Sequence, residues 1–194
     1  MQTGTNEIIA ATQEWLEKAV IGLNLCPFAK AVHVKKQIRY AVSAARNTEE
    51  LHADLVSELQ ILSATNAEQI DTTLLIHPYV LTNFLDYNDF LGVVDATIEE
   101  LGLDGKIQVA SFHPNYQFAG TAPEDIENYT NRSPHPLLHL LREASMERAV
   151  AAFPDAAEIF EKNMETMRTL GHAGWKRLGL PPLKANENKK SANQ

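Results

Sequence analysis

Two histidines stand at equivalent places in the sequence, each at the end of a run of strand-forming residues. His77 follows residues 74–76, His113 follows residues 110–112, and a proline comes directly after each histidine. Because proline cannot continue the pairing of a strand, both histidines are expected at the carboxyl ends of strands. Ligands of open α/β sheets bind at that edge, and a histidine can transfer protons near neutral pH. The sequence therefore predicts His77 and His113 as catalytic residues facing one crevice. The alternative is that each histidine only bonds a loop carbonyl.

A polar segment at residues 131–136 comes directly before a leucine-rich stretch that we expect to be a helix over residues 134–150. Ser133 would cap that helix, and a helix N-terminus can bind an anion. Arg132 would add a bidentate clamp for a carboxylate or phosphate. Simple capping, with Arg132 in solvent, is the alternative. The residues predicted to bind substrate are Asn131, Arg132, Ser133, His135 and Arg142.

The single cysteine, Cys26, is expected on a turn just past the first helix, near Lys30. It is either a buried, inert thiol, a third catalytic residue acting as nucleophile, or a metal ligand. His77, His113 and Cys26 would together suit a divalent metal such as zinc or iron. His135 and His139, four residues apart on the expected helix, offer a second possible pair of ligands. No cofactor other than such a metal is suggested by the sequence.

Several strings of residues resemble the bacterial and plant family catalogued as domain of unknown function 1415. They are Gly22-Leu23-Asn24-Leu25-Cys26-Pro27-Phe28-Ala29, Ser111-Phe112-His113-Pro114, Phe118-Ala119-Gly120, and the segment from Asn131 to Ala144. The resemblance spans roughly residues 5–179 and implies that these polar strings are shared motifs of the family. It implies no particular activity. His135 stands where the family pattern often has an aromatic residue, which argues against a catalytic role for it.

The elements that would position these residues alternate along the chain. Strands are predicted over 37–43, 72–76 and 106–112, and helices over 5–24, 47–62, 83–101, 134–150 and 156–170. Strands that alternate with helices favour parallel pairing through right-handed crossovers. We therefore expect an α/β fold with a small, mostly parallel sheet of three or four strands and about five main helices. Residues 1–183 would form a single domain, followed by a disordered tail over 184–194.

The composition of the chain disfavours several classes of partner. The chain of 194 residues carries a net charge of −8, which disfavours binding to nucleic acid or to an anionic membrane. One cysteine, no membrane-length apolar run and no secretory signal predict a cytoplasmic location.

These features favour an enzyme, a hydrolase or group transferase, that acts on a small anionic substrate. His77 or His113 would transfer protons, and Arg132 would hold the anion beside the start of the helix. Two alternatives stay open, a metal-binding protein and a non-catalytic module that senses a ligand.

Overall fold

The computed structural model describes residues 2–152 and 158–183, and four strands in it form one sheet. The strands are β1 (Ile38–Val42), β2 (Thr72–Ile76), β3 (Ile107–Phe112) and β4 (Leu137–Arg142), in the order β1-β2-β4-β3. β1 and β2 pair in parallel, whereas β4 is antiparallel to both β2 and β3. The α/β class is confirmed. The expectation of a mostly parallel sheet is wrong, because β4 is inserted between two strands that share one direction.

β4 also replaces half of the helix that the sequence predicts over residues 134–150. Residues 137–142 form the strand, and the helix α5 (Glu143–Ala151) begins only after it. The leucines fit a helical period, but a short apolar run fits a buried strand equally well. β4 has a strand on each side, and its leucines face both layers of helices, so the strand environment prevails.

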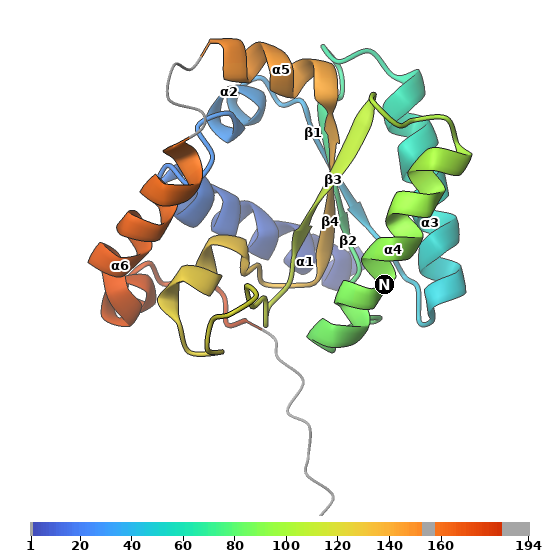
Figure 1. The fold of residues 1–194 in the computed structure, drawn as a ribbon. Coiled ribbons are helices and arrows are strands. Elements are labelled where there is room, and N and C mark those ends of the chain that lie inside the picture. Colours follow the sequence, from blue (N-terminus) through green and yellow to red (C-terminus); the bar gives the residue numbers. More distant parts are fainter. Residues whose placement is uncertain (1, 153–157, 184–194) are drawn as a thin grey trace, which may run out of the picture.

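Two long helices cover one face of the sheet, α3 (Thr48–Ala64) and α4 (Phe84–Glu100) (Figure 1). Both begin as the sequence predicts, because Asn47 and Asn83 accept hydrogen bonds from backbone N–H groups of the first turn. The apolar faces of these helices pack on side chains of the sheet that include Leu75, Leu138 and Leu140.

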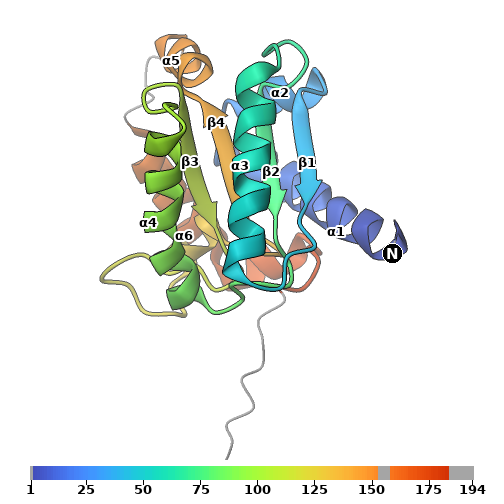
Figure 2. The same ribbon diagram turned by 90° about the vertical axis from the view of Figure 1, so that its right-hand side faces the viewer.

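The other face of the sheet is covered by the amino-terminal and carboxyl-terminal helices (Figures 1 and 2). These are α1 (Gln2–Trp15), the π-helical η1 (Leu16–Ile21) that continues it, α2 (Ala29–Val34) and α6 (Ile159–Arg177). Their core includes Trp15, Leu74, Ile76 and Leu137. Cys26 lies on the turn between η1 and α2, as expected.

The remaining segment that bears on the site is a 3₁₀ helix, η2 (Ile126–Asn131), which packs against α6 and leads into β4. α6 corresponds to the helix predicted over residues 156–170, whose first two residues lie outside the described part of the chain. The predicted tail over 184–194 also lies outside it, and the single domain stays a prediction. No helix among the described residues combines the length and the apolar character needed to cross a membrane.

Candidate functional site

His77 and His113 extend from the ends of β2 and β3 toward the same face of the sheet, the one that α4 covers. Their strands are not neighbours, because β4 lies between them. The ring of Tyr87 in α4 contacts both histidines, with centroids 5.7 Å from His77 and 5.1 Å from His113. The Tyr87 hydroxyl donates to the carbonyl of Leu137 and accepts from the N–H of Phe112. The structure thus brings the two histidines into one cluster organised by Tyr87.

His77 is completely buried, and only one of its ring nitrogens is hydrogen-bonded. Nδ1 lies 3.1 Å from the carbonyl oxygen of Val80. Because a carbonyl only accepts, Nδ1 carries the proton and Nε2 presents a lone pair. No group in the described part of the chain bonds that Nε2 atom. Burial lowers the pKa of His77 to about 4, so the ring is neutral at pH 7.

His113 is also completely buried, but both of its nitrogens are hydrogen-bonded. Nε2 lies 3.2 Å from the carbonyl oxygen of Leu81, and Nδ1 accepts from the N–H of Asn115 at 3.0 Å. These partners place the proton on Nε2. Burial lowers the pKa of His113 to about 4, which again gives a neutral ring at pH 7. Neither nitrogen of His113 is free to exchange a proton with a ligand in this arrangement.

The two histidines hold one loop from two strand ends, since their proton acceptors are the adjacent carbonyls of Val80 and Leu81. Leu81 has a φ of 54°, a left-handed conformation that is costly for leucine. Such strain persists only where the surroundings enforce it, and it is frequent at functional sites. The loop continues into residues 82–85, which form one wall of a cavity described next.

Arg132 lies at the same edge, almost buried, with 9% of its surface exposed. Its Nε donates to the carbonyl of Tyr116 at 3.1 Å, and Nη2 donates to the carbonyl of Pro123 at 2.6 Å. The guanidinium stacks over the ring of Tyr129, 4.4 Å from its centroid. Burial lowers the pKa of Arg132, yet an arginine keeps its charge in a protein. The ion pairs found among the described residues do not include this buried cation.

A cavity of about 430 Å³, which we call the Arg132 pocket, opens beside this guanidinium. It is lined by residues 82–85, Asn115, Gln117, Pro123 and Arg132. The first wall comes from the loop that His77 and His113 hold, and the second follows β3. The pocket therefore combines one buried positive charge with amide and hydroxyl groups, which is a suitable set for a small anion.

Three of the residues predicted to bind substrate do not line the pocket: Asn131, Ser133 and His135. Two of them instead bond backbone carbonyls of the segments next to it. The Asn131 amide donates to the carbonyl of Ser111 at 3.1 Å. The Ser133 hydroxyl donates to the carbonyl of His135 at 2.6 Å and closes a turn before β4. The predicted cap at Ser133 is thus wrong, because no helix begins there, and no helix N-terminus contributes to anion binding.

Arg142 is located away from this edge, because β4 runs against β2 and β3 and carries it to the opposite end of the sheet. Its guanidinium donates to the carbonyls of Leu62, Thr65 and Ile70, and so anchors the end of α3. A role for Arg142 beside Arg132 in binding substrate is therefore excluded.

Cys26 is separated from the two histidines by the sheet, since it packs on the α1 and α6 face. Burial raises the pKa of its thiol, which keeps the sulfur protonated at pH 7. The proposed metal site of His77, His113 and Cys26 does not form. The described residues contain no cluster of three or more potential ligands, and His135 and His139 lie on a loop and a strand rather than on one helix.

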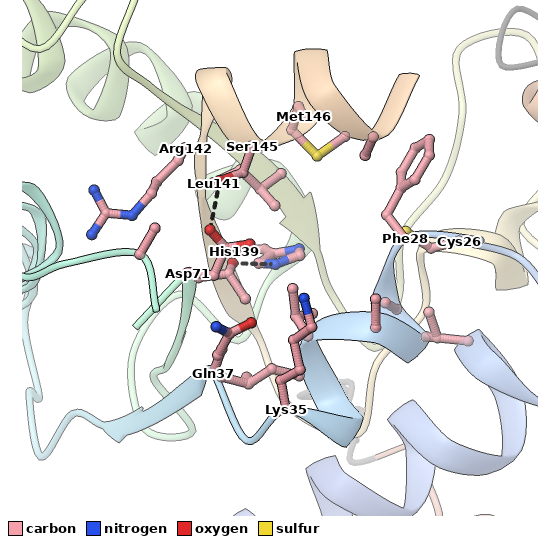
Figure 3. A pocket seen from close by; sticks show the side chains of 18 of the residues that line it. Cys26, Phe28, Lys35, Gln37, Asp71, His139, Leu141, Arg142, Ser145 and Met146 are labelled. Atoms are coloured by element: carbon pink, nitrogen blue, oxygen red, sulfur yellow. Dashed lines mark hydrogen bonds between the residues drawn. The ribbon is translucent and has the colours of Figure 1, made fainter. Parts of the chain in front are cut away.

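A second cavity, of about 530 Å³, lies on this other face, and we call it the His139 cavity. Most of its wall is apolar and includes Trp15, Leu74, Phe112 and Met146. His139 lies in the wall of this cavity, and Figure 3 shows it beside Asp71, with Cys26 farther away on the other side of the view. The sequence predicts Cys26 as a candidate site residue. It does not predict that His139 lines a cavity, because it predicts a helix at that position. The signal was the alternation of Leu137, His139 and Leu141 with Leu138 and Leu140 in a strand between two others.

The fold and its edge pocket define the chain as an α/β protein with a mixed four-stranded sheet and a polar cavity beside a buried arginine. The chain belongs to the DUF1415 family of proteins of unknown function, whose family model matches residues 7–177. The resemblance found in the sequence is therefore confirmed, and the match includes both cavities and all four strands. No curated protein and no solved structure matches the chain.

Proposed function

We propose that this protein binds a small anionic molecule in the Arg132 pocket. The observation that carries the proposal is the almost buried guanidinium of Arg132, which donates to two backbone carbonyls and forms no salt bridge among the described residues. The one carboxylate that attracts it, that of Glu124, is exposed to solvent. A buried charge is costly unless it is paired, and an anionic ligand would supply the pair. Asn115 and Gln117 add side-chain amides around the same space.

His77 and His113 are positioning residues in this proposal. Each holds one carbonyl of the loop that leads into the pocket wall, so they fix the pocket's shape without touching the anion. A hydrolase or group transferase acting on the anion is the finer part of our hypothesis. Proton transfer by His113 would require it to give up its bond to Leu81, so the geometry supports ligand binding more directly than catalysis.

The test is calorimetric titration of the full chain with inorganic phosphate and, separately, with succinate. Charge-assisted hydrogen bonds contribute roughly 1.5–3 kcal/mol, so Arg132→Gln should weaken binding by about tenfold or more. Arg132→Lys keeps the charge but loses the forked geometry, and should show an intermediate loss. Arg168→Gln is the control, because it removes one positive charge from an exposed ion pair with Glu127. Absence of binding to the wild type, or equal losses in Arg132→Gln and Arg168→Gln, would contradict the proposal.

A further inference from the structure

His139 lines the His139 cavity, and the hydrogen bonds of its neighbours show which ring nitrogen carries the proton. The hydroxyl of Thr72 donates to the carbonyl of Leu140 at 2.7 Å, and its oxygen lies 2.7 Å from Nε2 of His139. A hydroxyl has one proton, so satisfying both contacts requires His139 to donate from Nε2. Burial lowers the pKa of His139 to about 4, so the ring is neutral at pH 7. Nδ1 is therefore an unprotonated acceptor.

Nδ1 of His139 has no hydrogen-bond partner within residues 2–152 and 158–183. It belongs to a ring that lines the cavity together with Trp15, Leu74 and Phe112. A cavity lined by apolar groups binds apolar molecules well, and an unpaired acceptor in its wall adds a preference for one donor.

The charged residues that line the cavity are either exposed or hydrogen-bonded at its rim, and Lys35 and Glu68 are among the exposed ones. The hydroxyl of Ser145 donates to the carboxylate of Asp71 at 2.5 Å and accepts from Arg148 at 2.9 Å. Arg142 is bound to the carbonyls that end α3. The thiol of Cys26 is protonated, so neither it nor His139 offers a charge to a ligand in the cavity.

We infer that the His139 cavity is a second binding site, for a small uncharged organic molecule with an apolar body and one hydrogen-bond donor directed at Nδ1 of His139. A volume of about 530 Å³ is within the range of small-molecule sites. A charged ligand is disfavoured, because its charge would be buried against apolar side chains without a partner. This site shares no lining residue with the Arg132 pocket and does not depend on the function proposed for that pocket.

Cys26 gives a direct reporter of occupancy, because it lines the cavity and is the only cysteine in the chain. The experiment measures the rate at which iodoacetamide alkylates Cys26, followed by intact mass, with increasing concentrations of a probe. The probes are 2-naphthol, which has an apolar body and one hydroxyl donor, and 2-methoxynaphthalene, which has the same body and no donor. We expect saturable protection by both, with 2-naphthol effective at about three- to tenfold lower concentration because of one hydrogen bond.

His139→Gln removes the acceptor at the Nδ1 position and retains a side-chain amide whose Nε2 can donate to Thr72. With Nε2 on Thr72, the Oε1 acceptor of glutamine does not coincide with the former Nδ1 position. It should abolish the advantage of 2-naphthol while leaving protection by 2-methoxynaphthalene in place. His52→Gln is the matched control, since His52 also bonds a threonine hydroxyl, that of Thr97, but lies on α3 across the sheet. Ala149→Trp, which fills the cavity from α5, should remove protection by both probes.

Failure of both probes to protect Cys26 in the wild-type chain would overturn the inference. Equal potency of the two probes in the wild-type chain would overturn the assigned role of His139. The comparison of the two probes in the wild-type chain needs no variant. It therefore tests both the binding site and the role of His139 even if His139→Gln does not fold.

Discussion

Three buried or partly buried histidines of this chain differ in what their second ring nitrogen does. His113 has both nitrogens bonded, His77 keeps one lone pair buried without a partner, and His139 has one unbonded nitrogen in a ring that lines a cavity. Histidine thus fixes a loop through two hydrogen bonds at position 113, and offers an acceptor to a ligand at position 139. The hydrogen-bond partners decide between these roles, and a sequence does not contain them.

The neutral state of these histidines predicts how stability depends on pH. Each has a folded-state pKa of about 4, below the value of 6.5 expected when unfolded. Between these values the unfolded chain binds protons that the folded chain does not. The contribution of these histidines to the free energy of unfolding should therefore be constant above pH 6.5 and fall as the pH drops toward 4, by about 1.4 kcal/mol per pH unit for each histidine.

Urea denaturation of His77→Asn at several pH values checks this expectation. Asparagine can donate to the carbonyl of Val80 but does not titrate, so the slope below pH 6.5 should decrease by up to about 1.4 kcal/mol per pH unit. His33→Asn, on the surface of α2, serves as the control for loss of an imidazole. An unchanged slope in His77→Asn would show that His77 is not held neutral.

At the scale of elements, the sequence predicts most of the fold, and the reasons are local. Helices α3 and α4 begin at asparagine caps, and β2 is an apolar run with no helical period, so these boundaries are confirmed within one or two residues. β4 was missed because its leucines satisfy two periods at once. Residues 137–142 form a strand because they pair with β2 on one side and β3 on the other. That pairing is a property of the whole sheet and is not visible in the local sequence.

The prediction of a helix over residues 134–150 also explains which parts of the candidate site the sequence predicts correctly and which it does not. The meeting of His77 and His113 follows from two strands of common direction, and the structure places them in one cluster. The role of Ser133 and the position of Arg142 both depended on a helix at 134–150, so both changed when that segment became a strand.

A strand in the middle of the sheet should be among the last segments to open. We predict that backbone amides of β4 exchange with solvent only through global unfolding, whereas those of α5 exchange through local opening. Native-state hydrogen exchange followed by NMR measures both. If residues 137–142 exchanged as fast as residues 143–151, the central position of β4 would be contradicted.

The molecule holds two separate cavities of different character, one at the edge of the sheet and one on the face that α1 and α6 cover. The Arg132 pocket is polar and holds a positive charge, whereas the His139 cavity is apolar and its histidine is neutral. A positive pocket within a chain of net charge −8 concentrates the attraction for an anion at one place.

Because no side chain lines both cavities, we expect their ligands to bind independently. Saturating inorganic phosphate should change the protection of Cys26 by 2-naphthol by less than about twofold, which is below the usual range of allosteric coupling. A larger change would indicate coupling through the sheet, for which the adjacent Phe112 and His113 offer a direct route.

The central claim about this protein is that the Arg132 pocket binds an anion, and an NMR titration of the labelled chain with inorganic phosphate tests that claim most directly. We predict that the largest shifts occur at the Arg132 Nε–H and at the side-chain amides of Asn115 and Gln117, with little change at residues 137–142. Shifts spread over surface lysines, or centred on the His139 cavity with none at Arg132, would contradict it.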